Sequence, residues 1–311
     1  MKFGFGVDLG GTTVKLAYFD EAGTMLDKWE IPTDISEDGK NILPDIAKAI
    51  LDYMHRNNIS REQILGVGIG VPGAVNHLGI VAGCDNLGWG YFSVKDALEP
   101  LLGMNVIAGN DATVAALGEC WKGGGQGYKS VVLVTLGPGV GGGIIIDGKP
   151  LHGFTGSAGE IGHMVLNRHE TAICGCGKSG CVEQYCSASG ISRLMKLALA
   201  ESDAPSALRD LEKIMAKDVF DAANSGDKLA QQVLEQVYAY MGEFIANICC
   251  VVNPEVVVLG GGVSRAGEPL LEGVKKSFAK WGYHACRDTQ FRLATLGNDA
   301  GAYGAFKLIA E

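Results

Sequence analysis

The stretch "FGFGVDLGGTTVKLAYF" (residues 3–19) decides the fold of this chain. Two short apolar runs, 3–9 and 14–19, flank the turn "GGTT", and a third run at 25–31 follows the turn "DEAGT". Apolar runs of this length that end at glycine turns are typical of β-strands. The sequence therefore predicts that the chain begins with a three-stranded β-meander.

Helices alternate with strands after this meander. Apolar side chains at helical spacing, Ile42, Ile46 and Ile50, predict a helix over about 40–57. A buried strand is predicted in "ILGVGIGVPG", another strand in "NVIAGND", and a helix over 111–121. This alternation is typical of an α/β lobe.

The same pattern then restarts. The segments "SVVLVTLG" (130–137) and "GGGIIIDG" (141–148) predict a hairpin, and apolar periodicity predicts a long helix over 228–252. The segment "EVVVLGGG" is predicted to be a strand that enters a glycine turn, and a final helix is predicted over 299–310. Two α/β lobes with a cleft between them are the architecture expected from this order.

The lobe boundary is expected in the loop-like segment "WKGGGQGYK" (121–129). We predict a small lobe over 1–121, joined by the C-terminal helix at about 299–311. The large lobe is predicted over 122–298. At 311 residues the chain is long enough for two such lobes.

Composition and charge exclude several functional classes. The chain has 26 Lys and Arg against 35 Asp and Glu, a net charge of −9, which argues against a general nucleic-acid binder. It has no stretch resembling a signal peptide and no apolar run approaching about 18 residues. We therefore expect a cytoplasmic protein that binds neither nucleic acid nor a membrane.

Three glycine turns each follow an apolar strand: "DLGGTT" (8–13), "TLGPGVGGG" (135–143) and "GGGVS" (260–264). Backbone N–H groups in such turns bind phosphate well. One turn of this kind is an ordinary hairpin turn, but three suggest a bound nucleotide. The spacing matches neither a P-loop nor the dinucleotide-binding fingerprint.

Three cysteines, Cys174, Cys176 and Cys181, have the spacing of metal ligands. A fourth ligand is needed to close a tetrahedral zinc site, and both His163 and His169 are near enough in sequence. The spacing does not choose between these histidines. A redox switch, or unrelated reduced thiols, would be the alternatives to zinc.

Other polar residues allow two interpretations each. Asp111 follows a strand and starts a predicted helix, so it, or Asn110, would serve as an N-cap. Glu160 and His163 would share one face if their segment is helical. Such a pair usually lies on the exposed surface of a protein. A carboxylate and an imidazole can, however, also form hydrogen bonds with the hydroxyl groups of a sugar.

The motifs "DLGGT", "GNDA", "TLGPGVGGG", "EIGH", "CGCGKSGCVE" and "LGGGVS", in this order, resemble the ROK family of sugar kinases and repressors. The resemblance runs from Val7 to the final helix and is greatest with bacterial ROK glucokinases. It implies an actin-like, hexokinase-type (ribonuclease H-like) α/β fold, with two lobes that close on sugar and ATP at an interlobe cleft.

The resemblance also implies roles for particular residues. Asp111 would be the catalytic base. The sugar ligands would be Asn110, Asp111, Glu160, His163 and Glu183, with Asn86 and Gly73 as lesser candidates. ATP would lie on Gly10, Gly11, Thr12, Thr135, Gly137, Gly139, Gly261 and Gly262. Zinc would be held by His163, Cys174, Cys176 and Cys181. Asp8 would hold Mg²⁺ through water.

The sequence departs from the family pattern at Pro138, where a threonine is usual. Proline lacks an N–H donor and a hydroxyl group, so we expect weaker or rearranged phosphate contacts at this turn. The function of the turn is expected to survive, because Thr135, Gly137 and Gly139 are present.

The function implied is an ATP-dependent hexose kinase, a glucokinase that makes glucose 6-phosphate with ATP, Mg²⁺ and a structural Zn²⁺. Kinases for N-acetylmannosamine, N-acetylglucosamine or allose share these motifs and are the alternatives. A sugar-responsive ROK regulator is the alternative of another class. It is disfavoured because "VDLGG" begins at residue 7, which leaves no room for an N-terminal helix-turn-helix. A homodimer is expected by analogy with the family.

Overall fold

A computed structural model describes residues 2–310, and these residues form two compact units. Within the described residues, unit 1 comprises 2–129, 143–159 and 295–310. Unit 2 comprises Ser130–Gly142 and Glu160–Ala294. The chain therefore passes between the units four times, and the second passage lies within a single strand, β9 (Val140–Ile146).

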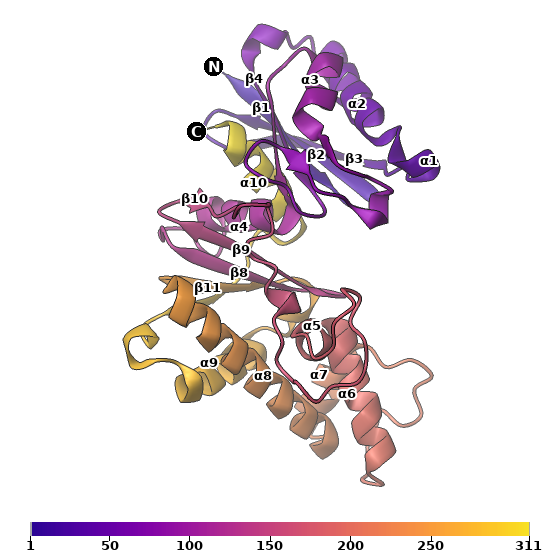
Figure 1. Cartoon of the computed structure of the whole chain (residues 1–311), viewed down its shortest axis with the longest axis vertical. Coiled ribbons are helices and arrows are strands. Elements are labelled where there is room, and N and C mark those ends of the chain that lie inside the picture. The colour runs from indigo at the N-terminus through magenta and orange to yellow at the C-terminus, as the bar shows by residue number, and fades with distance from the viewer. Residues whose placement is uncertain (1, 311) are drawn as a thin grey trace. The chain divides into compact units, whose positions relative to one another are not determined.

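Unit 1 is built on a five-stranded sheet of order β3-β2-β1-β4-β7 (Figure 1). Its strands are β1 (Phe3–Leu9), β2 (Thr13–Asp20), β3 (Met25–Pro32), β4 (Ile64–Val71) and β7 (Val106–Asn110). The first three strands are antiparallel neighbours, while β1, β4 and β7 are parallel. The carboxyl ends of β1 and β7, which carry Asp8 and Asn110, therefore lie at the same edge of the sheet.

The two faces of this sheet are covered by different helices. Phe5, Val7 and Leu9 of β1 are fully buried in one apolar core together with residues of α2 and α3. The alternate position Gly6 faces α10, where a Cβ atom would overlap the carbonyl oxygen of Ala302. Glycine therefore lets α10 approach the sheet backbone closely.

Unit 1 also contains five helices and three short strands among its described residues. The helices are α1 (Ser36–Gly39), α2 (Ile42–Arg56), α3 (Val94–Leu102), α4 (Asp111–Lys122) and α10 (Ala300–Ile309). The short strands are β5 (Ile80–Val81), β6 (Phe92–Ser93) and β10 (Lys149–Pro150). Helix α4 packs against α10, as the contacts between these two elements show.

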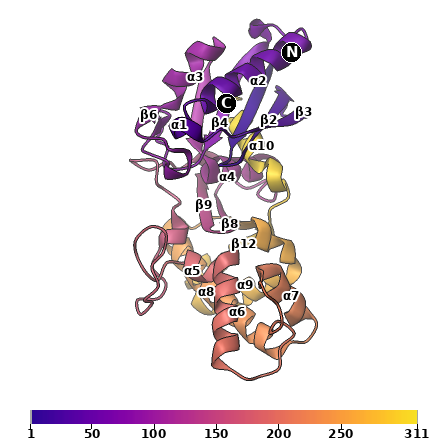
Figure 2. The same ribbon diagram turned by 90° about the vertical axis from the view of Figure 1, so that its right-hand side faces the viewer.

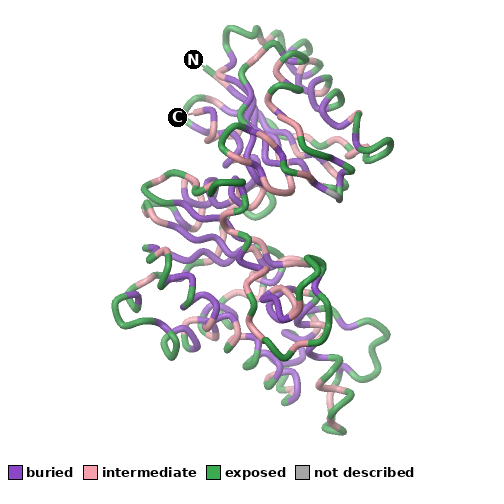
Figure 3. Tube along the Cα trace, viewed as in Figure 1, coloured by how far each residue is buried: buried purple, intermediate pink, exposed green. Residues whose placement is uncertain are grey.

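Unit 2 contains the central strands of a second sheet, whose order is β10-β9-β8-β11-β12. The strands β8 (Val131–Leu136), β11 (Val256–Gly260) and β12 (Gln290–Leu293) are parallel neighbours, and every residue of β11 is buried (Figure 3). The helices are α5 (Glu183–Cys186), α6 (Ala188–Glu201), α7 (Ala216–Asn224), α8 (Lys228–Val252) and α9 (Glu268–Trp281). The long helix α8 packs against α6, α7 and α9 (Figure 2).

The elements predicted from the sequence are confirmed within a few residues. The predicted helices 40–57, 111–121 and 228–252 correspond to α2, α4 and α8. The predicted lobe bounds of 1–121 and 122–298 stay a prediction, and they differ from the compact units at 122–129, 143–159 and 295–298. The last residue of the predicted C-terminal helix, Glu311, lies outside the described residues. Within residues 2–310, no helix is both long and apolar enough to span a membrane.

Candidate active site and metal-ligand cluster

Asn110 and Asp111 stand where β7 passes directly into α4. Asn110 is the N-cap of α4: its Oδ1 accepts a hydrogen bond from the N–H of Thr113 at 2.9 Å. Asp111 is the first residue of the helix, and its Oδ1 accepts from the N–H of Ala112 at 2.7 Å. The structure therefore assigns the cap to Asn110 and puts Asp111 at the positive end of the helix dipole.

The side-chain amide of Asn110 also donates two hydrogen bonds to its neighbours. Its Nδ2 donates to the carbonyl oxygen of Gly73 at 2.9 Å and to Oδ1 of Asp111 at 3.0 Å. Asn110 is buried, so these bonds are shielded from water. The predicted sugar candidates Gly73 and Asn110 thus contact each other, whereas Asn86 is exposed on the 3₁₀ turn Asp85–Leu87.

Asp8 lies near the end of β1, beside the turn formed by Gly10 and Gly11. Its Oδ2 is 3.3 Å from Nζ of Lys15 on β2. Burial raises the pKa of Asp8 above its ordinary value, and the Lys15 ammonium partly offsets this effect. The carboxylate lies against Gly301 near the N-terminus of α10. An oxygen donor of this type suits Mg²⁺.

The turn after Asp8 is closed by backbone hydrogen bonds. The N–H of Gly10 donates to the carbonyl oxygen of Thr13 at 3.1 Å, and the hydroxyl of Thr33 donates to the carbonyl oxygen of Gly10 at 2.7 Å. Gly11 and Thr12 are exposed. The turn is thus fixed at its base and open to solvent at its tip, which suits contact with a phosphate group.

Two other predicted nucleotide turns lie side by side in unit 2. Thr135 of β8 and Gly260 of β11 are register partners at the carboxyl ends of adjacent parallel strands. The turn after β8 is closed by a bond from the N–H of Gly137 to the carbonyl oxygen of Gly139 at 3.0 Å. Beyond β11, Gly261 adopts a φ of 81° and leads into the 3₁₀ helix Gly262–Ala266.

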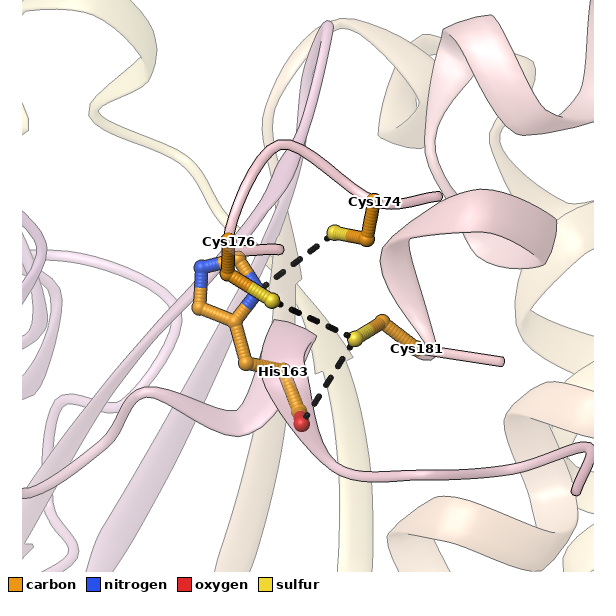
Figure 4. A group of neighbouring side chains, drawn as sticks. All are labelled: His163, Cys174, Cys176 and Cys181. Atoms are coloured by element: carbon orange, nitrogen blue, oxygen red, sulfur yellow. Dashed lines mark hydrogen bonds between the residues drawn. The ribbon is translucent and has the colours of Figure 1, made fainter. Parts of the chain in front are cut away.

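The cysteine trio forms a cluster with one histidine (Figure 4). The ligand atoms of His163, Cys174, Cys176 and Cys181 all lie within 4.8 Å of one another. Sγ of Cys174 is 3.8 Å from Nδ1 of His163, and Sγ of Cys176 is 3.6 Å from Sγ of Cys181. His169, the other candidate from the sequence, is exposed and outside this cluster.

The chemistry of this donor set fits zinc. Three thiol sulfurs and one imidazole nitrogen are a common ligand set of structural zinc sites. Burial raises the pKa of Cys174 and raises that of Cys181 to about 12. These thiols therefore need a nearby cation to ionise at neutral pH, and a zinc ion supplies that charge.

The predicted sugar-binding carboxylates flank the cluster. Glu160 is exposed and immediately precedes the 3₁₀ helix Ile161–His163, three residues before the ligand His163. Glu183 begins α5 two residues after Cys181, and its Oε1 is 3.6 Å from Sγ of Cys174. His163 and Glu183 therefore lie beside the same thiol, that of Cys174.

The loop that carries the cysteines has a second anchor away from the cluster. Glu170 accepts hydrogen bonds from the N–H of Ala172 at 3.0 Å, the hydroxyl of Tyr185 at 2.7 Å and the guanidinium of Arg193 at 2.9 Å. The bond from the Ala172 N–H, followed by those from Tyr185 and Arg193, lowers the pKa of Glu170 to about 2. The loop is therefore attached to α5 and α6 by an ionised carboxylate.

Comparison with known proteins shows to which family the chain belongs. A model described as "ROK family" matches residues 4–311. The chain belongs to the ROK family. It is 43% identical over 311 residues to a protein named glucokinase from Halalkalibacterium halodurans, covering 98% of this chain and 94% of that protein. A protein named glucokinase from Thermotoga maritima is 34% identical over 312 residues, covering 98% and 96%.

A solved structure extends the likeness to three dimensions. The chain is similar to a ROK family glucokinase from Streptomyces griseus in complex with glucose and AMPPNP, with a TM-score of 0.78 and 33% identity over 98% of both chains. Family membership confirms the resemblance drawn from the motifs. It also confirms the actin-like, hexokinase-type α/β fold that the resemblance implied.

The ROK motifs divide between the two units. Unit 1 holds Asp8, Gly10, Gly11, Thr12, Gly73, Asn86, Asn110 and Asp111. Unit 2 holds Thr135, Gly137, Gly139, Glu160, His163, Cys174, Cys176, Cys181, Glu183, Gly261 and Gly262. Their individual roles stay predictions.

Sequence reasoning missed Glu119, a buried glutamate of α4. Its side chain is 1% exposed, and its carboxylate accepts from the N–H groups of Gly124, Thr295 and Leu296 at 2.7, 3.1 and 2.9 Å. One carboxylate thus holds the two segments that precede Ser130 and follow Ala294, where the chain changes units. A lone glutamate within the apolar helix segment "VAALGECW", directly before a glycine-rich loop, was the available signal.

Proposed function

We propose that this ROK protein is an ATP-dependent hexose kinase, a glucokinase that transfers the γ-phosphoryl group of ATP to glucose to give glucose 6-phosphate. The observation that carries the proposal is the likeness of 98% of the chain to proteins named glucokinase. One solved relative carries both glucose and an ATP analogue.

Asp111 is the proposed general base. Phosphoryl transfer to an alcohol needs a group that accepts the hydroxyl proton as the oxygen attacks the γ-phosphorus. The hydrogen bonds from Asn110 and Ala112 to Oδ1 support this role, because they fix the orientation of the carboxylate. The positive end of α4 stabilises its ionised form.

Glu160, His163 and Glu183 are the proposed sugar ligands in unit 2, and Asn110 is the proposed ligand in unit 1. Carboxylate oxygens accept hydrogen bonds from sugar hydroxyl groups, and an imidazole can donate or accept one. The burial of Asn110 and its two donated bonds support a fixed position for its amide. Asn86 and Gly73 are lesser candidates for contact with the sugar.

The glycine turns are the proposed phosphate sites. Gly10, Gly11 and Thr12 present backbone N–H groups and a hydroxyl, and Thr135, Gly137 and Gly139 present a second set. Gly261 and Gly262 would lie near the adenosine. When bound, Mg²⁺ would neutralise charge on the phosphates, and Asp8 would hold it through water, since Lys15 already contacts Oδ2 of Asp8.

A zinc ion held by His163, Cys174, Cys176 and Cys181 would be structural. Four protein ligands leave no open coordination position, so the ion would not act as a Lewis acid. Its proposed task is to hold the cysteine loop so that Glu160, His163 and Glu183 keep their mutual positions.

A panel of sugars tests the choice of substrate. ADP release would be measured with ATP, Mg²⁺ and each of glucose, N-acetylglucosamine, N-acetylmannosamine and allose. We expect glucose to give the highest kcat/KM. A higher value for an N-acetylated sugar or allose would replace glucose but keep the kinase. No sugar-dependent ADP release would overturn the kinase and favour a sugar-responsive regulator.

We also infer a homodimer that works in the cytoplasm, by likeness to the family. Light scattering after gel filtration would test the first inference, with a mass of twice 32.6 kDa as the expected result. A mass equal to one chain would overturn it.

A further inference from the structure

The two carboxylate oxygens of Glu183 point to two different predicted sites. Oε1 lies 3.6 Å from Sγ of Cys174 in the metal-ligand cluster. Oε2 accepts a hydrogen bond from the N–H of Val140 at 3.1 Å. Val140 directly follows Gly139, so this bond ends at the glycine turn proposed to hold phosphate. One side chain therefore touches both sites.

The turn is shaped to receive this carboxylate. A Cβ atom on residue 139 would overlap Oε2 of Glu183, so the contact requires glycine at this position. The turn is also held from its other end, because the carbonyl oxygen of Gly137 accepts from the N–H of Ala188 at 2.8 Å. The segment 183–188 thus contacts the turn at two points, one by a side chain and one by the backbone.

The same segment is continuous with the metal ligands. Cys181 lies two residues before Glu183, and the N–H of Val182 between them donates to the carbonyl oxygen of Met164 at 2.9 Å. Met164 follows His163, the fourth ligand. A metal ion that joins His163 to Cys181 would therefore hold together the two bonded segments, 163–165 and 181–182, the second of which leads directly into Glu183.

We propose that Glu183 is a positioning residue that couples the metal-ligand cluster to the turn 137–140, so that the metal supports nucleotide binding as well as sugar binding. This inference rests on the proposed function, in which the turn contacts the phosphates of ATP. The distance between these motifs in the sequence would instead suggest that loss of the metal lowers sugar affinity more than ATP affinity.

Two substitutions separate the positioning role from sugar binding. Glu183→Gln keeps a carbonyl oxygen that can accept from Val140, whereas Glu183→Ala does not. We expect Glu183→Ala to weaken the binding of Mg²⁺·AMPPNP, measured by calorimetry, by about tenfold, the usual effect of one lost hydrogen bond to a charged group. Glu183→Gln should stay within about threefold of the wild type, roughly half that free energy. Both should bind glucose more weakly.

Glu160→Ala is the matched control, because Glu160 is also a predicted sugar carboxylate but no hydrogen bond joins its side chain to the turn among the described contacts. The Glu160→Ala change should weaken glucose binding and leave AMPPNP binding unchanged.

Hydrogen exchange of the Val140 amide gives a measurement that does not need substrate. Protection of this amide should fall in Glu183→Ala and persist in Glu183→Gln and Glu160→Ala.

Removing the metal tests the coupling itself. Removal of zinc by a chelator should weaken AMPPNP binding to the wild type and expose the Val140 amide. The same treatment of Glu183→Ala should change AMPPNP binding little further, because the link is already broken. Circular dichroism would verify that each stripped sample stays folded, and the Glu170 anchor gives a reason to expect this.

The outcomes distinguish failure of this inference from failure of the proposed function. Wild-type protein that does not bind AMPPNP at all would contradict the proposed kinase. Wild-type protein that binds AMPPNP, together with a Glu183→Ala variant of equal affinity and an equally protected Val140 amide, would overturn the coupling alone. Equal losses in the Ala and Gln variants would also overturn it.

Discussion

The side-chain amide of Asn110 donates a hydrogen bond to Oδ1 of Asp111 over 3.0 Å. The same amide group caps α4 through Oδ1 of Asn110. The cap, which the sequence left open between the two residues, is thus made by Asn110, and the same side chain donates to Asp111. The proposed base is therefore positioned by the first turn of the helix that it begins.

Asn110→Ala should lower both stability and turnover. Loss of the cap should lower the free energy of unfolding by about 1–2 kcal/mol. Loss of the bond to Asp111 should lower kcat as well, because the proposed base is no longer oriented. Urea unfolding and the ADP-release assay measure the two effects.

Ser93→Ala is the control for this prediction. Ser93 caps α3 by accepting from the N–H of Asp96 at 3.1 Å, and the proposed catalytic role does not involve it. The Ser93→Ala variant should lose about as much free energy of unfolding as Asn110→Ala but keep the kcat of the wild type. Equal kcat in Asn110→Ala and Ser93→Ala would contradict the orienting role of Asn110.

Elemental analysis should find one zinc per chain in the wild type. Cys176→Ser should lose the metal, because three ligands close a tetrahedral site poorly, and His163→Ala should lose it for the same reason. Cys176 is exposed, so its replacement disturbs little packing. His169→Ala and Cys186→Ala should keep the metal, since neither residue belongs to the cluster. A metal-free wild type, or loss of zinc only in His169→Ala, would contradict the assignment.

Glu119→Ala should be among the most destabilising single changes in α4. It leaves the N–H groups of Gly124, Thr295 and Leu296 without their acceptor, which should cost about 2–4 kcal/mol in the free energy of unfolding. Glu119→Gln should lose less, because one oxygen remains. Replacing Glu235, an exposed glutamate of α8, should cost under about 0.5 kcal/mol in the same urea titration. A loss of under about 0.5 kcal/mol in the free energy of unfolding of Glu119→Ala would refute the role of its carboxylate.

Glu170 should contribute stability that depends on pH. Its pKa in the folded protein is lowered from 4.5 to about 2, so the contribution is fully present above about pH 4.5 and is lost as pH falls through about 2. Glu170→Gln should therefore lower the free energy of unfolding by roughly 1–3 kcal/mol at pH 7, and by less at pH 3.

Urea titrations of the wild type and Glu170→Gln from pH 7 to pH 3 measure this difference. Glu212→Gln, a change at an exposed glutamate outside the anchor, provides the baseline. A difference between wild type and Glu170→Gln that stays constant down to pH 3 would show that ionised Glu170 is not what holds the loop.

The elements and the metal ligands were predictable because they are encoded locally. Strands such as β1 are short apolar runs between glycine turns, and α2 has a regular apolar face. The cysteines lie within eight residues, so their spacing alone predicted a metal cluster. The choice of His163 over His169 came from family resemblance and is supported by the three-dimensional cluster.

Contacts between distant segments were not predictable from the sequence. The bond from Val140 to Glu183 joins residues 43 positions apart, and those from Thr295 and Leu296 to Glu119 join residues 176 and 177 positions apart. Such bonds depend on how a loop is brought back to a strand or helix, which no local pattern encodes. For the same reason, the sequence placed Glu183 near the sugar but not beside the phosphate turn.

Turnover by Asp111→Asn tests the central claim most directly. The variant keeps the shape of the side chain and removes the proton acceptor. We predict that it binds glucose and Mg²⁺·AMPPNP with wild-type affinity, and that its kcat in the ADP-release assay with glucose falls by about 10²–10⁴-fold. A pure, folded Asp111→Asn protein with near-normal kcat would contradict the account.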